Sequence, residues 1–130
     1  LEIDAFFMNE DRHTNNIAVI YNEKTQKYEL SPFFDQGLCM FADINQDYPI
    51  DQSLEYCLEK IEAKPFSSDF DIQLDAAEEL YGIQIGFQFT FKDIQIYLQK
   101  NSENYPREVI RRVEQLLRRQ MRKYGYLMKK

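Results

Sequence analysis

The clearest pattern in the sequence is an amphipathic segment close to its C-terminal end. Apolar side chains recur there at three- and four-residue steps, the spacing of one helix face: Val109, Ile110, Val113, Leu116, Leu117, Met121 and Tyr124. Pro106 stands at the expected first helical position and Gly125 follows the last apolar residue, so both ends of the helix are marked. A helix with one apolar face needs a body to pack against.

Shorter segments are expected to supply that body. The pattern predicts the end of a buried helix at residues 1–8, and a β-hairpin with strands at 17–21 and 27–30, the first of which is buried. It also predicts three short helices, at 53–61, 69–80 and 91–99. Their expected caps are Ser53, either Asp69 or Asp71, and Thr90. No internal repeat or linker interrupts the chain. The fold class predicted is mainly α with a small β-hairpin, in one domain over 1–130.

Composition narrows the class of protein. With 4 Gly and 4 Pro in 130 residues, a turn-rich all-β sandwich is disfavoured. No apolar run is long enough to cross a membrane and no basic-then-apolar leader is visible, so we expect a cytoplasmic protein without a membrane partner. Cys39 and Cys57 follow no metal or disulfide spacing and are expected to be free thiols.

Charge is distributed unevenly along the chain. Residues 99–130 carry 10 Lys and Arg against 3 Asp and Glu, while residues 1–98 carry 6 against 19. The simplest interpretation is that the basic C-terminal helix neutralises its own acidic body. Direct binding of nucleic acid is not expected, because a polyanion would have to overcome the negative field of that body.

The side chains suited to chemistry lie before and after the expected hairpin. Asp11 and Asn16 stand five residues apart in one polar loop, and Asp35 follows the second strand. A hairpin returns the chain beside its start, so the three side chains can reach one pocket. A carboxylate near an incoming hydroxyl, with amide and carboxylate oxygens for Mg²⁺, is what phosphoryl transfer requires. Gly37 is expected to let the backbone turn tightly after Asp35.

Asp-Arg-His-x-x-Asn at 11–16, followed by strand, turn, strand and Phe-Asp-x-Gly at 34–37, resembles the catalytic and metal-binding loops of HipA-like serine/threonine kinases. The resemblance implies a kinase-like large lobe that uses Mg²⁺ and ATP to phosphorylate a protein substrate. It implies that Asp11 is the catalytic aspartate and that Asn16 and Asp35 bind the metal and cofactor. Arg12, His13 and Gly37 would support the catalytic loop.

The chain departs from a complete kinase in several ways. Its glycines, at positions 37, 82, 86 and 125, form no glycine-rich loop, and no lysine precedes Asp11. We therefore expect the small ATP-binding lobe to lie outside this chain, in a longer protein or in a partner, and the isolated chain to be inactive. An exposed edge left by that lobe would favour a homodimer.

Other partners and functions stay open from the sequence. Some HipA-like kinases belong to toxin–antitoxin systems, so the resemblance also admits a DNA-binding antitoxin-like partner. Phosphoinositide-kinase-like enzymes carry a similar Asp-Arg-His-x-x-Asn, so a lipid or other small-molecule kinase is an alternative. A non-catalytic helical interaction domain or a pseudokinase-like module is another.

Overall fold

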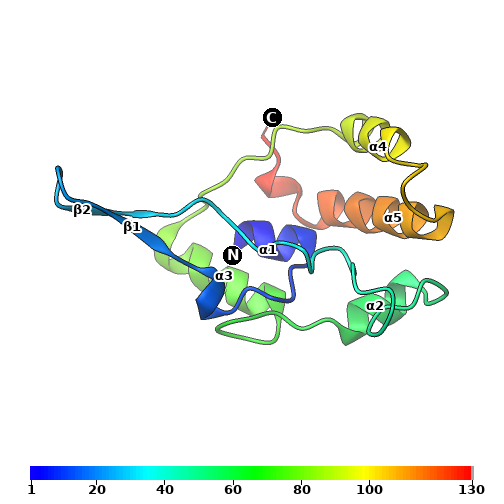
Figure 1. Ribbon diagram of the computed structural model, residues 1–130, viewed down its shortest axis with the longest axis horizontal. Coiled ribbons are helices and arrows are strands. Elements are labelled where there is room, and N and C mark those ends of the chain that lie inside the picture. Colours follow the sequence, from blue (N-terminus) through cyan, green and yellow to red (C-terminus); the bar gives the residue numbers. More distant parts are fainter. Residues whose placement is uncertain (130) are drawn as a thin grey trace.

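The computed structural model of the protein describes residues 1–129 and is mainly helical (Figure 1). Within these residues five α-helices and one two-stranded antiparallel sheet follow one another as α1 Glu2–Phe7, β1 Val19–Asn22, β2 Lys27–Leu30, α2 Leu54–Lys60, α3 Phe70–Tyr81, α4 Phe91–Lys100 and α5 Arg107–Lys123. Short 3₁₀ turns occupy Thr14–Asn16 and Gly125–Leu127. The predicted combination of a mainly helical fold with one hairpin is confirmed.

Helix α1 lies at the centre of the body, with α3 on one side and α5 on the other (Figure 1). Its Ala5 and Phe6 side chains are almost fully buried. The Phe6 ring packs on Phe87 and Tyr124, at centroid distances of 4.6 and 6.3 Å. The buried Gln120 amide of α5 donates to the carbonyl oxygens of Ala5 and Phe6, which are left free where α1 ends. The expected buried helix at 1–8 is thus confirmed, and it forms the centre of the core.

Three helices begin where the sequence places their caps. The Ser53 hydroxyl accepts from the Tyr56 amide, and the Asp69 carboxylate accepts from the first amides of α3. Thr90 and Asp93 form a capping box at the start of α4. Each cap satisfies backbone donors that have no partner within the helix, which explains why the local sequence locates these ends so well.

The hairpin projects from the body, and no other element among residues 1–129 covers either of its faces (Figure 1). The expectation that its first strand is buried is wrong: all eight strand residues are exposed. The pairing register puts one apolar set on a single face, namely Val19, Tyr21, Tyr28 and Leu30, with exposed fractions of 48 to 72%. An apolar strand is buried only if another layer covers it, and the described residues contain no second layer here.

The segment that connects the hairpin to α2 has little regular structure and is held by polar contacts. The buried guanidinium of Arg112 in α5 donates to three backbone carbonyl oxygens of this segment, those of Phe41, Tyr48 and Pro49. A buried guanidinium satisfied by carbonyl oxygens needs no carboxylate partner.

No helix among residues 1–129 is both long and apolar enough to cross a membrane.

Candidate functional site

The polar loop 9–16 begins where α1 ends and is anchored to that helix. The buried Asp4 carboxylate of α1 accepts a bifurcated hydrogen bond from the single Arg12 Nε–H, with both oxygens at 3.1 Å, and a further hydrogen bond from the Asn9 amide. Arg12 and Asp4 therefore form a buried ion pair, and the Asn9 amide adds a second donor to the carboxylate. The loop is fixed to the most buried helix of the protein.

The other end of the Arg12 side chain reaches the hairpin. Its Nη1 atom donates to the carbonyl oxygen of Asn16, at 3.1 Å, and to that of Phe34, at 3.2 Å. The neighbouring backbone is tied as well, because the Glu10 amide donates to the Leu38 carbonyl at 3.2 Å. The turn that contains Asp35 is thus held at both of its ends by residues 10 and 12, the two neighbours of Asp11.

Asn16 is buried and its amide group closes the loop. Its Nδ2 atom donates to the Asp11 carbonyl at 2.8 Å and lies 3.2 Å from His13 Nε2. The Oδ1 atom accepts no hydrogen bond from the residues that the structure describes. Because the nitrogen is engaged within the loop, the oxygen is the atom of this side chain available to a cation.

His13 lies against the same two side chains. Its Nε2 atom is 3.7 Å from Asp11 Oδ1, and its Nδ1 atom is buried without a hydrogen-bond partner among residues 1–129. The His13 side chain is 39% exposed, so it lines the loop without being enclosed by it. The contact with Asn16 is the kind expected of a residue that supports the loop.

Asp35 lies in the turn that follows the hairpin, and its side chain is exposed. Its backbone has φ of 55°, in the left-handed region that Asp tolerates better than most residues. The backbone turns at Gly37 and Leu38, after Asp35, but the positive φ belongs to Asp35, and a Cβ atom on Gly37 would meet nothing within 4 Å, so this turn does not depend on a glycine. Left-handed residues gather at functional sites more often than elsewhere.

The oxygen atoms of these two loops meet only part of what a bound Mg²⁺ ion requires. Among the described residues, no three His, Cys, Asp or Glu side chains come together to hold a metal. Mg²⁺ does not need such a cage, since it takes one or two protein oxygens and completes its shell with water and phosphate oxygens. The Asn16 Oδ1 atom and the Asp35 carboxylate are oxygen donors of the right kind on loops that Arg12 joins.

Sequence reasoning missed the supports of the site. Asp4, the partner of Arg12, lies on the helix at 1–8, which was predicted from its apolar residues alone. The alternation of polar and apolar residues in that segment is the signal that could have identified Asp4. Glu10 was also missed: its carboxylate accepts a hydrogen bond from Tyr48, 38 residues away. Burial raises the pKa of Glu10, the Tyr48 hydrogen bond opposes that shift, and the pKa of Tyr48 is raised by its own burial and by Glu10.

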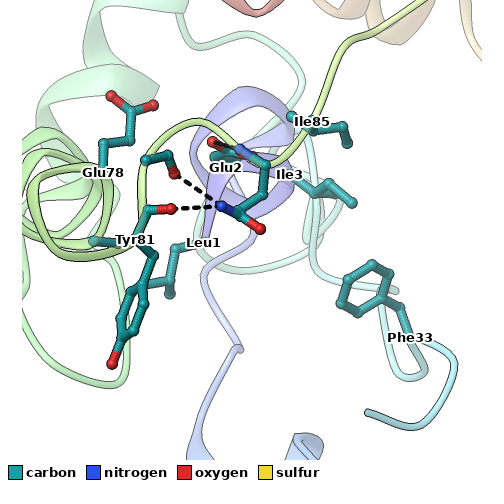
Figure 2. Close-up of a pocket in the computed structure, with 10 residues that line it drawn as sticks. Leu1, Glu2, Ile3, Phe33, Glu78, Tyr81 and Ile85 are labelled. Atoms are coloured by element: carbon teal, nitrogen blue, oxygen red, sulfur yellow. Dashed lines mark hydrogen bonds between the residues drawn. The ribbon is translucent and has the colours of Figure 1, made fainter. Parts of the chain in front are cut away.

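Two hollows adjoin the hairpin base. One of about 140 Å³ is lined by Arg12 and Asn16 together with residues of the hairpin, while Asp11 and Asp35 are not among its lining residues. A larger one of about 520 Å³ lies between the start of α1 and the end of α3 (Figure 2). Figure 2 shows Phe33 across this hollow from Tyr81. The Gln84 side chain donates to the carbonyl oxygens of Tyr81 and Gly82 at the end of α3. Leu1 and Phe33 line both hollows, so the two adjoin at the start of α1 and the exit of the hairpin.

Comparisons of the chain with protein-family models, with curated proteins and with solved structures found no match.

Proposed function

We propose that the chain is the large, catalytic lobe of an atypical Mg²⁺- and ATP-dependent kinase of the HipA-like type, which phosphorylates serine or threonine of a protein. The observation that carries the proposal is the pair of contacts around Asp11. Arg12 holds the Phe34 carbonyl and Glu10 holds that of Leu38, so the Asp-Arg-His-x-x-Asn loop and the Phe-Asp-x-Gly turn are joined on both sides.

Each side chain then has a separate chemical task. Mg²⁺ and ATP, when bound, supply the phosphoryl group and the positive charge that stabilises its transfer. The Asn16 Oδ1 atom and the Asp35 carboxylate are the oxygens offered to the ion. The Asp11 carboxylate, which accepts no hydrogen bond within residues 1–129, would orient the substrate hydroxyl and accept its proton.

The exposed hairpin supports the same proposal. A two-stranded sheet is marginally stable alone and normally packs an apolar face against another layer. In this chain the apolar face formed by Val19, Tyr21, Tyr28 and Leu30 is open. A small ATP-binding lobe, in the same polypeptide or in a partner, would cover that face and place the nucleotide between itself and the two loops.

Metal binding by the chain itself tests the proposal. Mn²⁺ with ADP should broaden the amide NMR signals around residues 11, 16 and 35, because a paramagnetic ion held by Asn16 and Asp35 lies beside them. Asp35→Asn should weaken this binding about tenfold or more, since it removes the carboxylate charge. Asp75→Asn, an exposed acidic residue of α3, is the matched control and should leave the signals unaffected.

The same titration separates the two aspartates. Asp11→Asn should still bind Mn²⁺ with ADP, and in an enzyme with both lobes it should lower phosphate transfer about a hundredfold or more. The chain alone should transfer no phosphate. Broadening around α3 in place of the two loops, or metal affinity unchanged by Asp35→Asn, would contradict the proposed site.

A further inference from the structure

Helix α5 presents a row of arginines to solvent. Arg107, Arg111, Arg118 and Arg122 are exposed and are separated by four, seven and four residues, which are close to whole helical turns. They form one line of roughly 20 Å along the helix, at about 1.5 Å per residue. Beside the second half of this arginine row, a shallow hollow of about 470 Å³ is lined by Gln115, Arg118, Arg119, Arg122 and Lys123.

The charge of the arginine row is not used by the protein's own body. Among the described residues, the ion pairs of α5 are Lys123 with Asp71 of α3, and Arg118 with Glu114 of the same helix. The expectation that the helix neutralises the acidic body is met at Asp71, where Lys123 forms the ion pair and Arg119 adds positive charge, and it does not account for the arginine row. The other inward contact from a basic side chain, that of Arg112, goes to carbonyl oxygens.

Packing keeps the arginine row in place and turned outward. The apolar face of α5 is buried against the body through Leu116 and Leu117, so the helix cannot rotate to bury the row. The Arg118 guanidinium stacks over the Phe91 ring of α4 with 4.4 Å to its centroid. Figure 1 shows α4 and α5 side by side along one edge of the molecule, away from the hairpin.

We propose that the arginine row of α5 binds an acidic polypeptide segment of a partner protein. An extended segment of six or seven residues spans roughly 20 Å at about 3.3 Å per residue, so its carboxylates match the length of the row. Arginine suits this task because its planar fork binds carboxylates in pairs of hydrogen bonds. The inference does not depend on the kinase proposal.

Size and charge favour this occupant over other polyanions. Residues 1–98 hold 6 Lys and Arg against 19 Asp and Glu, so a nucleic acid that extends past α5 would meet a strongly negative surface. An anionic lipid surface is also wider than α5 and would meet the same negative body on either side of the row. A short acidic segment can bind along the row without reaching the acidic body, and the one carboxylate it meets there is Glu114, which is already paired with Arg118.

The test compares two variants of equal net charge. The probe is a fluorescein-labelled peptide of about ten alternating Glu and Ser residues, measured by anisotropy at low ionic strength. Arg107→Gln, Arg111→Gln and Arg122→Gln together should weaken its binding about tenfold. Lys24→Gln, Lys27→Gln and Lys64→Gln together remove the same charge from exposed positions elsewhere and should leave the affinity within about twofold.

A third variant, which keeps the positive charge at the same three positions, serves as a control for folding of the helix. Replacing Arg107, Arg111 and Arg122 by Lys keeps the charge but loses the paired hydrogen bonds, so binding should weaken by about threefold, clearly less than in the Gln variant, with the same salt dependence. Equal loss in the two Gln variants would overturn the proposal, because net charge alone would then explain binding. So would loss in the Lys variant as large as in the α5 Gln variant, tighter binding of an oligonucleotide or of anionic vesicles through the same arginines, or no binding of the peptide at all.

Discussion

Helix α1 and the hairpin are both short and rich in apolar side chains, yet they have opposite environments. In α1 the side chains of Ala5 and Phe6 are at most 1% exposed, because α3, α5 and the segment around Phe87 surround them. In the hairpin, Tyr28 is 72% exposed. Other elements surround α1, whereas none among residues 1–129 covers the hairpin. The hydrophobicity of a segment therefore indicates that burial would stabilise it, but not whether other parts of this chain bury it.

The two regions are connected by a few polar contacts at the hairpin base. Arg12 joins Asp4 of α1 to the Phe34 carbonyl, and Glu10 joins the same loop to Leu38 and Tyr48. Apolar packing therefore stabilises the core, and buried hydrogen bonds position the candidate site. The difference between the regions can be measured by removing one contribution at a time.

The largest effect is expected from the core. Phe6→Ala leaves a cavity at the centre of the aromatic cluster and should lower the free energy of unfolding by about 4 kcal/mol. Tyr28→Ala, the matched aromatic truncation on the hairpin, should change it by less than about 0.5 kcal/mol because the ring is already in water. Urea denaturation measures both, and comparable losses would show that the hairpin is packed in solution.

An intermediate effect is expected where the regions join. Arg12→Gln leaves the Asp4 carboxylate buried without its cation and should cost about 3 kcal/mol. It also releases Phe34, so hydrogen exchange should accelerate at 19–30 more than in α5. Arg118→Gln, an exposed arginine paired with Glu114, is the control and should cost below about 1 kcal/mol. Uniform acceleration across the chain would mean that Arg12 stabilises the fold without positioning the hairpin.

The smallest effect is a pH dependence at Glu10. Burial raises its pKa above the ordinary value of 4.5, Tyr48 opposes the shift, and Asp47 and Asp43 add to it. A carboxyl with a raised folded-state pKa contributes stability that is present below the unfolded value and is lost as pH rises through the folded value. As the pH falls from neutral to about pH 5, the wild type should become slightly more stable relative to Glu10→Gln, because this partly buried carboxyl takes up its proton more readily in the folded state.

Thermal unfolding of the two proteins across that range gives the difference directly. Asp51→Asn, an exposed carboxyl in the same segment, is the control and should behave as the wild type does. A gain in stability with rising pH would contradict the assigned environment of Glu10, because it would require a carboxyl that is better stabilised as an anion in the folded state.

The sequence alone determined where most elements lie. Ser53, Asp69 and Thr90 mark helix starts because a capping side chain acts on amides two or three residues away, which is local information. The three- and four-residue spacing of apolar residues predicted α5, and the two strand segments predicted the hairpin. Asp11, Asn16 and Asp35 were likewise readable as a spaced motif.

Only the tertiary structure decided which groups meet and which stay exposed. Arg12 could be seen as a motif residue, but its bonds to Asp4 and to the Phe34 carbonyl join positions 8 and 22 residues away. The strand at 17–21 was predicted to be buried, and it is exposed because no other element among residues 1–129 covers the hairpin, which no local pattern reports. The polar side chains of Gln120 and Arg112 point inward because they donate hydrogen bonds to free carbonyl oxygens of α1 and of the segment before α2. Whether a residue is buried depends on its neighbours in space, whereas a sequence gives only its neighbours along the chain.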